Sequence, residues 1–386
     1  MDSHGTTDSP SLPWRAAASM TMWGVGGLCR AFLTCLTHAE VHGGEAFTEL
    51  LDSRQQLSGR SKGLITAWTI RWSGGSYLFD SGIGGGHSVA MISVTRIGTV
   101  PYCFALTAAN EKCLRRPLAF FFTMGQVLPT HRLVHSQFGG LAQPAVTQAI
   151  RLLSKGPFPV DHHRATPDRQ HWSLQNVCVD PFSDLPVAYT TNGEDAHQAP
   201  SAFACNTYSW VHIFPEGKIH QAPRKTMRYF KWGVARLILE ASECPDVVPM
   251  WIEGFDEIMH ESREFPRFLP RPGKHVSVTF GSKVDSEAVF GDMRSRWQKL
   301  KAKAEAADPQ SRGLPLGVLS EELLNNREAV ELRKEVTMKV RNLVLEVRRS
   351  RGLPDEDPKE GLVETWLEEG PKREGHMKDD SWVRDI

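Results

Sequence analysis

Short apolar segments alternate with amphipathic helical patterns along this chain, and that alternation limits the fold more than any other feature. Four segments are short, rich in β-branched or aromatic side chains and bounded by turn residues, which predicts buried strands. Two further segments carry apolar side chains at helical spacing. The predicted strands are residues 63–70, 210–214, 247–252 and 276–280, and the predicted helices are residues 141–153 and 227–241. Strands that alternate with helices predict an α/β fold with a mostly parallel sheet flanked by helices.

The most apolar run covers residues 18–36, but it is a poor candidate for a membrane span. Arg30 lies inside it and Gly24, Gly26 and Gly27 loosen it, whereas a spanning helix needs about 20 strongly apolar residues. Trp23 within the run suits a segment that lies in the lipid headgroup region. Three interpretations stay open: an interfacial or re-entrant membrane segment, a buried core helix, and a cleaved signal.

A second long helix is predicted for residues 328–349. Its apolar residues form one stripe, and the rest of the segment is mostly Glu, Lys and Arg. Such a helix either docks on the domain or binds a membrane surface or partner. The stripe consists of Ala329, Leu332, Val336, Val340, Leu343 and Val347.

Charge and cysteine content exclude several classes of protein. Lys+Arg and Asp+Glu both number 45, so no net charge draws the chain to nucleic acid. The seven cysteines are scattered and never stand in C-x-x-C spacing, which argues against a disulfide framework and a zinc site. Because the acidic residues concentrate near the C-terminus, the rest is mildly basic, which favours an anionic membrane surface.

Composition also predicts the domain organisation. Residues 155–209 are rich in Pro, His, Asp, Thr and Asn, which predicts a long insertion. The segment after Pro354 is acidic and lacks an apolar pattern, which predicts disorder. The predicted parts are a membrane-associated segment (1–45), an α/β domain (46–290, with the insertion at 155–209), a helical extension (291–353) and a disordered tail (354–386).

The strongest local motif is Phe214-Pro215-Glu216-Gly217, which follows the predicted strand at 210–214. It places a carboxylate and a flexible backbone N–H group at the edge of a sheet, where open α/β folds build their sites. Pro and Gly are also the commonest turn residues, so the tetrapeptide alone is a weak signal.

Longer matches around this motif resemble the tafazzin family, and within it the fungal members. They include WVHIFPEGK at 210–218, FKWGVARLILE at 230–240, VVPMWIEG at 247–254 and FPRFLPRPGK at 265–274. GQVLPTHR at 125–132 and GGLAQPAVTQAIRLLS at 139–154 resemble the same family. The family belongs to the glycerolipid acyltransferase superfamily, so the resemblance implies a glycerolipid-acyltransferase-like α/β domain that lies on a membrane.

The resemblance also implies a function: coenzyme-A-independent transfer of an acyl chain between a phospholipid and a lysophospholipid, which remodels cardiolipin. It implies a peripheral or interfacial place on a mitochondrial membrane, outer or inner, facing the intermembrane space. Arg132 would contact the substrate phosphate, Glu216 and Gly217 would shape the phosphate-binding pocket, and Phe214, Pro215 and Pro249 would line the acyl site. Guanidinium suits phosphate because it binds bidentately and keeps its charge. No cofactor or metal is required, since a hydroxyl nucleophile, a neutral histidine and backbone donors suffice.

One superfamily motif is missing. Members carry N-H-x-x-x-x-D after the strand that ends in GLIT, and the histidine is the general base on the lipid hydroxyl. In this chain GLIT is followed by residues 67–100, in which His87 has Ile92 five positions later. Two causes stay open, an error in the gene model and true loss of the site. The alternative function is therefore a catalytically inactive lipid-binding or scaffold protein.

His163 and Asp168 are the one pair in the chain with H-x-x-x-x-D spacing. They are weak candidates for a relocated catalytic pair, because they lie in the insertion and come after the second motif instead of before it. A working base needs fixed geometry within hydrogen-bond reach. Coincidence is the better interpretation of their spacing.

Overall fold

The computed structural model describes residues 12–68, 103–108, 127–130, 140–155, 188–189, 197–198, 208–217, 221–222, 224–260, 269–312, 314 and 316–369. Its described strands form a seven-stranded sheet in the order β1-β9-β8-β2-β7-β3-β4. Neighbouring strands are parallel except for the antiparallel pair β8 and β9. The prediction of an α/β fold with a mostly parallel sheet is confirmed. The strands are β1 (Thr37–His42), β2 (Leu64–Ala67), β3 (Cys103–Ala108), β4 (Val127–Thr130), β7 (Trp210–Ile213), β8 (Asp246–Glu253) and β9 (Lys274–Phe280).

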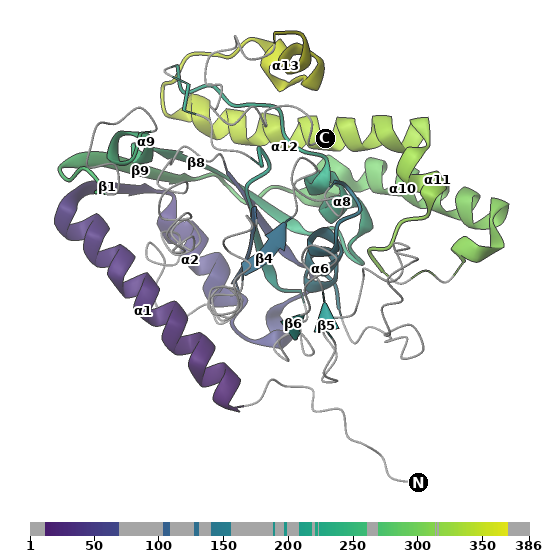
Figure 1. Ribbon diagram of the computed structural model, residues 1–386, viewed down its shortest axis with the longest axis horizontal. Coiled ribbons are helices and arrows are strands. Elements are labelled where there is room, and N and C mark those ends of the chain that lie inside the picture. Colours follow the sequence, from purple (N-terminus) through teal and green to yellow (C-terminus); the bar gives the residue numbers. More distant parts are fainter. Residues whose placement is uncertain are drawn as a thin grey trace.

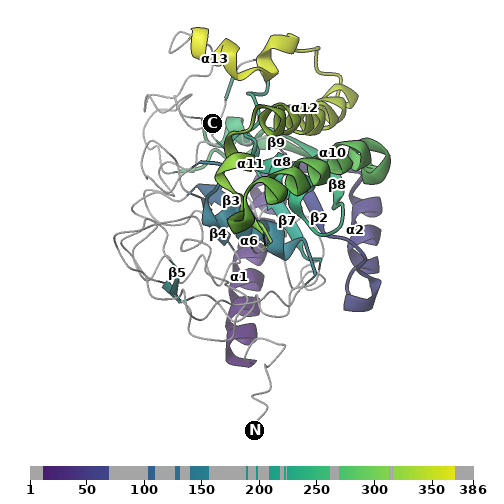
Figure 2. The ribbon, with the colours of Figure 1, turned by 90° about the vertical axis from the view of Figure 1, so that its right-hand side faces the viewer.

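Helices lie on both faces of this sheet (Figures 1 and 2), and each face is covered by a separate hydrophobic cluster. Side chains that alternate along β2 divide between them: Ile65 and Ala67 enter one cluster, and Leu64 and Trp68 enter the other. The first face is covered by α6 (Pro144–Leu152), α8 (Gly233–Glu240), α10 (Ser286–Ala307), α11 (Glu321–Asn325) and α12 (Arg327–Ser350). The second is covered by α2 (Gly44–Ser53), α9 (Phe255–Ile258) and the last turn of α1 (Leu12–Leu36).

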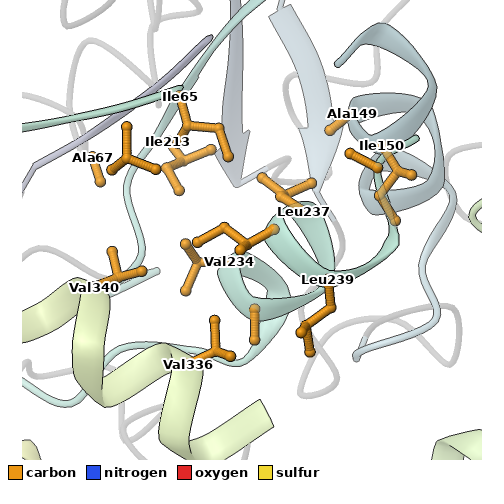
Figure 3. Packing of buried hydrophobic residues seen from close by; sticks show 14 of the residues in the cluster. Ile65, Ala67, Ala149, Ile150, Ile213, Val234, Leu237, Leu239, Val336 and Val340 are labelled. Atoms are coloured by element: carbon orange, nitrogen blue, oxygen red, sulfur yellow. The ribbon is translucent and has the colours of Figure 1, made fainter. Parts of the chain in front are cut away.

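The core lies between the sheet and the first group of helices. Figure 3 shows side chains of β2 and β7 facing Val234 and Leu237 of α8, with Val336 and Val340 of α12 behind them. The apolar stripe predicted for residues 328–349, which lie in α12, is therefore buried against the domain, and Leu343 is partly buried. Of the two interpretations of this helix, docking on the domain is confirmed.

The helix predicted for residues 227–241 begins later than its apolar spacing suggests. It starts at Gly233, although Met227, Tyr229 and Phe230 are buried. The backbone before it is bound elsewhere, because Lys231 N–H donates to the carbonyl of Pro215 at 2.7 Å. Tertiary hydrogen bonds thus replace the first helical turns.

The other predicted elements lie close to their expected positions. Strand β2 ends at Ala67, Trp68 is buried directly after it, and the remaining residues of the predicted strand lie outside the described residues. The insertion contributes the antiparallel pair β5 (Ala188–Tyr189) and β6 (His197–Gln198), and most of it lies outside the described residues. Short 3-10 helices occupy Leu57–Gly59 and Pro309–Ser311.

The structure differs from two of the predicted boundaries. Strand β1 begins at Thr37 and pairs with β9, so the sheet starts before residue 46. The segment predicted as a disordered tail is folded as far as Glu369, with a 3-10 helix (Pro358–Gly361) and α13 (Val363–Glu369). That prediction is wrong for residues 354–369, because Glu356 and Trp366 are buried anchors within the acidic sequence. Residues 370–386 lie outside the described residues.

Candidate functional site

The candidate site lies where β2, β7 and β8 run side by side. Ala67 of β2 stands opposite Ile213 of β7 on one side and Pro249 of β8 on the other. The chain leaves the sheet directly after Ala67 and Ile213, so Trp68 and Phe214 occupy the same carboxyl edge. Ligand sites of open α/β sheets form at such an edge.

The turn at residues 214–217 is fixed by backbone hydrogen bonds. Gly217 N–H donates to the carbonyl of Phe214 at 2.9 Å, and Lys231 N–H donates to the carbonyl of Pro215. Gly217 has φ of 62°, and a Cβ atom there would lie 2.5 Å from Cε of Lys231. The left-handed backbone therefore favours glycine at this position, whereas the flexible end of the lysine side chain can move aside.

Glu216 points back toward the protein and is 1% exposed. Its Oε2 accepts the backbone N–H of Arg228 at 3.0 Å, which joins the turn to the segment that follows it. This contact gives Glu216 a role in holding the turn. Its part in shaping a pocket for a substrate phosphate stays a prediction.

A buried polar cluster lies on the sheet face that α2 covers. Thr66 Oγ1 is 2.6 Å from Nδ1 of His212 and accepts Nε1–H of Trp210 at 2.8 Å. Because the indole N–H can only donate, Thr66 Oγ1 accepts it and keeps its own proton and a second lone pair for Nδ1 of His212. Nδ1 of His212 is therefore engaged by Thr66 in either tautomer.

Aromatic rings close the carboxyl edge around His212. The Trp68 ring packs against His212 at 4.8 Å and against Phe214 at 5.3 Å between centroids. His212 and Phe214 also meet edge to face at 4.9 Å. The rings form a tight aromatic wall beside the turn, and Trp68 and Phe214 are both buried in the cluster on this face of the sheet.

The opposite edge of the sheet carries a structural ion pair. The Arg54 guanidinium donates to the carbonyls of Lys62 and Tyr208 and lies 3.6 Å from the Asp246 carboxylate. Burial lowers the pKa of Arg54 to about 10, and Asp246 opposes that shift. These contacts bind together the amino ends of β2, β7 and β8, which leaves the carboxyl edge for a ligand.

Sequence comparison relates this chain to known proteins. No family model matches the chain. It is 32% identical to tafazzin of Saccharomyces cerevisiae over 268 residues, which cover 66% of this chain and 61% of the yeast protein. The chain is therefore similar to a tafazzin over about two thirds of its own length. It is also 36% identical to tafazzin of Drosophila melanogaster over 87 residues, 22% of each chain.

A plant protein shares a shorter stretch with this chain. The match is 39% identical to N-acylphosphatidylethanolamine synthase of Arabidopsis thaliana over 79 residues, 20% of this chain and 28% of the plant protein. The chain thus spans about three fifths of yeast tafazzin and smaller shares of the other two.

The structure brings together only some of the residues predicted for a tafazzin site. Phe214, Pro215, Glu216 and Gly217 form the turn, and Pro249 lies buried in β8, where its carbonyl accepts Gly281 N–H at 2.8 Å. Among the described residues no group of three metal-binding side chains occurs. The predicted residues Arg132, His163 and Asp168 lie outside the described residues, as do residues 69–100 around the missing motif.

Sequence reasoning missed the Thr66–His212 pair and the role of Arg228. A histidine inside the apolar run WVHIF was the one available signal for the pair. Its partner comes from β2, 146 positions away, and only the register of the sheet brings the two together.

Proposed function

We propose that this chain, as a member of the tafazzin family, has the glycerolipid-acyltransferase-like fold of a phospholipid–lysophospholipid transacylase and binds its lipids at the carboxyl edge of β2 and β7. The 214–217 turn beside Pro249 and the Trp68 and Phe214 rings is the observation that carries this proposal. The turn and Arg132 would hold a lipid phosphate, and the aromatic wall would hold an acyl chain. Cardiolipin remodelling at a mitochondrial membrane is the corresponding role, without a cofactor.

The exposed face of α1 supports attachment to the membrane surface. Met20, Trp23 and Leu28 are each more than two thirds exposed, and Ala31 continues the same side of the helix. Within the described residues no helix is both long enough and apolar enough to cross a bilayer. An apolar helix face of this kind, with a tryptophan at its centre, fits a helix lying in the interface.

Among the described residues at the carboxyl edge, no side chain is placed to act as the general base for acyl transfer. Strand β2 ends in Ala67 and Trp68, and Trp68 is already packed against His212. His212 is fully buried and its Nδ1 is engaged by Thr66, so it is unsuited to take a proton from a lipid hydroxyl. This observation favours the second candidate function, a lipid-binding protein without turnover.

One experiment separates the two functions. Acyl exchange between labelled phosphatidylcholine and monolysocardiolipin is measured for the unmodified chain and for a chimera whose residues 67–100 carry N-H-x-x-x-x-D. A positioned base supplies about 10²–10⁴-fold, so the unmodified chain should show only a trace of exchange and the chimera should show clear turnover. Equal rates in both would place the base elsewhere, and His163→Ala would then test the weak candidate.

The phosphate assignment has its own test. Arg132→Ala should weaken binding of a soluble short-chain phosphatidylglycerol by roughly ten- to a hundredfold, because a charge-assisted hydrogen bond to phosphate is lost. Arg30→Ala, an exposed change in α1, is the matched control. Unchanged affinity in Arg132→Ala would remove that residue from the site.

A further inference from the structure

The segment at residues 224–231 lies directly behind the 214–217 turn and has no regular secondary structure. It nevertheless holds the turn at two points, through Arg228 N–H to Glu216 and Lys231 N–H to the carbonyl of Pro215. The position of the turn therefore depends on what fixes this segment.

Two arginines of α12 fix it from the other side. Arg341 donates from Nε to the carbonyl of Arg228 at 3.0 Å and from Nη2 to the carbonyl of Met227 at 2.9 Å. Arg348 lies seven residues later on the same helix face and donates from Nε to the carbonyl of Lys225 at 3.0 Å. The backbone of Arg228 is thus bound at its N–H by Glu216 of the turn and at its carbonyl by Arg341 of α12.

Glu356, from the folded C-terminal segment, lies between the two arginines. Its Oε2 is 2.6 Å from Nη2 of Arg341, and its Oε1 is 3.3 Å from Nε of Arg348 and accepts Met227 N–H at 2.7 Å. All three charged side chains are at most 3% exposed. Removing the carboxylate would leave two buried cations close together, without the anion that pairs with both.

Helix α13 covers the same segment from outside. The Arg228 guanidinium lies 4.8 Å from the Trp366 ring centroid and 5.1 Å from that of Tyr229. Trp366 is 2% exposed and its Nε1–H donates to the carbonyl of Glu360. Figure 1 shows α13 beyond α12, on the side away from the sheet.

We propose that residues 354–369 position the 214–217 turn, with Glu356 as the positioning residue that acts through Arg341 and the Arg228 peptide. The functional half of this proposal rests on the turn being the phosphate site proposed above. An intact C-terminal segment is then a condition for lipid binding at a site to which it contributes no contact.

The test compares Glu356→Gln with the full-length unmodified chain by peptide-resolved hydrogen exchange. Amides at 224–231 and 214–217 should exchange about tenfold faster or more, while those of α6 and β9 keep their rates. Glu335→Gln is the matched control, because Glu335 is an exposed carboxylate of α12 that pairs with Arg296. Trp366→Ala is a second variant, which leaves the buried charges in place and keeps the test decisive should Glu356→Gln fail to fold.

Binding of monomeric dihexanoylphosphatidylglycerol supplies the second readout. A local rise in exchange together with an about tenfold weaker affinity supports the proposal. Unchanged exchange at 214–231 in a folded variant, or an equal rise throughout the protein, overturns the positioning role. A local rise with unchanged affinity supports the coupling and overturns the phosphate site of the proposed function.

Discussion

Helices α1 and α12 have nearly the same length, 25 and 24 residues, and opposite surroundings. Nearly half of the residues of helix α12 are charged, yet its apolar stripe is buried in the core. Helix α1 has an apolar sequence, yet within its described side chains only Gly26 and Leu33 are buried. Burial of a helix on this sheet is therefore decided by the arrangement of its apolar residues and not by their number.

The physical reason lies in how each helix can be held. The stripe of α12 fits one face of the sheet, and its flanking arginines, such as Arg333, Arg341 and Arg348, donate to backbone carbonyls. Helix α1 has apolar residues on several sides, and its glycines offer no side chain to pack against another part of the protein. It is attached to the sheet chiefly through its last turn, where Leu33 packs and Leu36 accepts Gly273 N–H.

The largest effect that would sharpen this comparison is expected from Val340→Asp in α12. Burying a carboxylate in the main cluster should cost about 4 kcal/mol or more and prevent stable folding. Urea unfolding followed by circular dichroism measures this effect. Lys339→Asp is the control, since the adjacent side chain is exposed and its change should stay within about 0.5 kcal/mol. Equal losses in the two variants would contradict the buried stripe.

A double change, Trp23→Ser with Leu28→Ser, tests the other helix. We expect binding to cardiolipin-containing liposomes to weaken roughly a hundredfold, because two exposed apolar side chains no longer enter the interface. The loss corresponds to about 2.7 kcal/mol and is measured by flotation.

Stability supplies the contrast for the same double variant. Its free energy of unfolding should change by less than about 0.5 kcal/mol, since neither side chain is packed in the core. Ala31→Ser, an exposed change on the same side of α1, serves as the control. Unchanged flotation, or a clear loss of stability, would mean that α1 is held by the protein like α12.

The smallest effect is expected from Arg296→Ala. Arg296 of α10 pairs with Glu335 on the solvent side of α12 at 2.8 Å, and both side chains are nearly half exposed. Such pairs contribute about 0–1 kcal/mol, so the midpoint of thermal unfolding should fall only slightly. A loss comparable to that of Val340→Asp would show that surface charges, and not the stripe, hold α12 in place.

Much of the fold follows from local pattern. The strands at 210–213, 246–253 and 274–280 were predicted within a few residues because each is a short apolar run between turn residues. Strand β1 escaped prediction because its residues are largely exposed and polar, and it becomes a strand by pairing with β9. The late start of α8 has a similar cause, since distant hydrogen bonds override its helical spacing.

The site was predictable only where a motif is continuous in sequence. The 214–217 turn is such a motif, whereas the pairing of Thr66 with His212 and of Arg341 with Glu356 depends on tertiary structure. The predicted disorder after residue 354 failed for the same reason. Composition shows the acidic character of that segment, but it does not show that Glu356 pairs with two buried arginines in the folded protein.

The pairing of β1 with β9 has a consequence for the order in which the chain is made. Helix α1 leads directly into β1, whose partner β9 is synthesised roughly 230 residues later. At about 5–20 residues per second, α1 emerges on the order of 10 to 50 s before the strand that anchors it exists. During that interval its apolar side chains are available to a chaperone, a targeting factor or a lipid surface. The earliest part of the chain therefore docks only after the last strand of the sheet has been made.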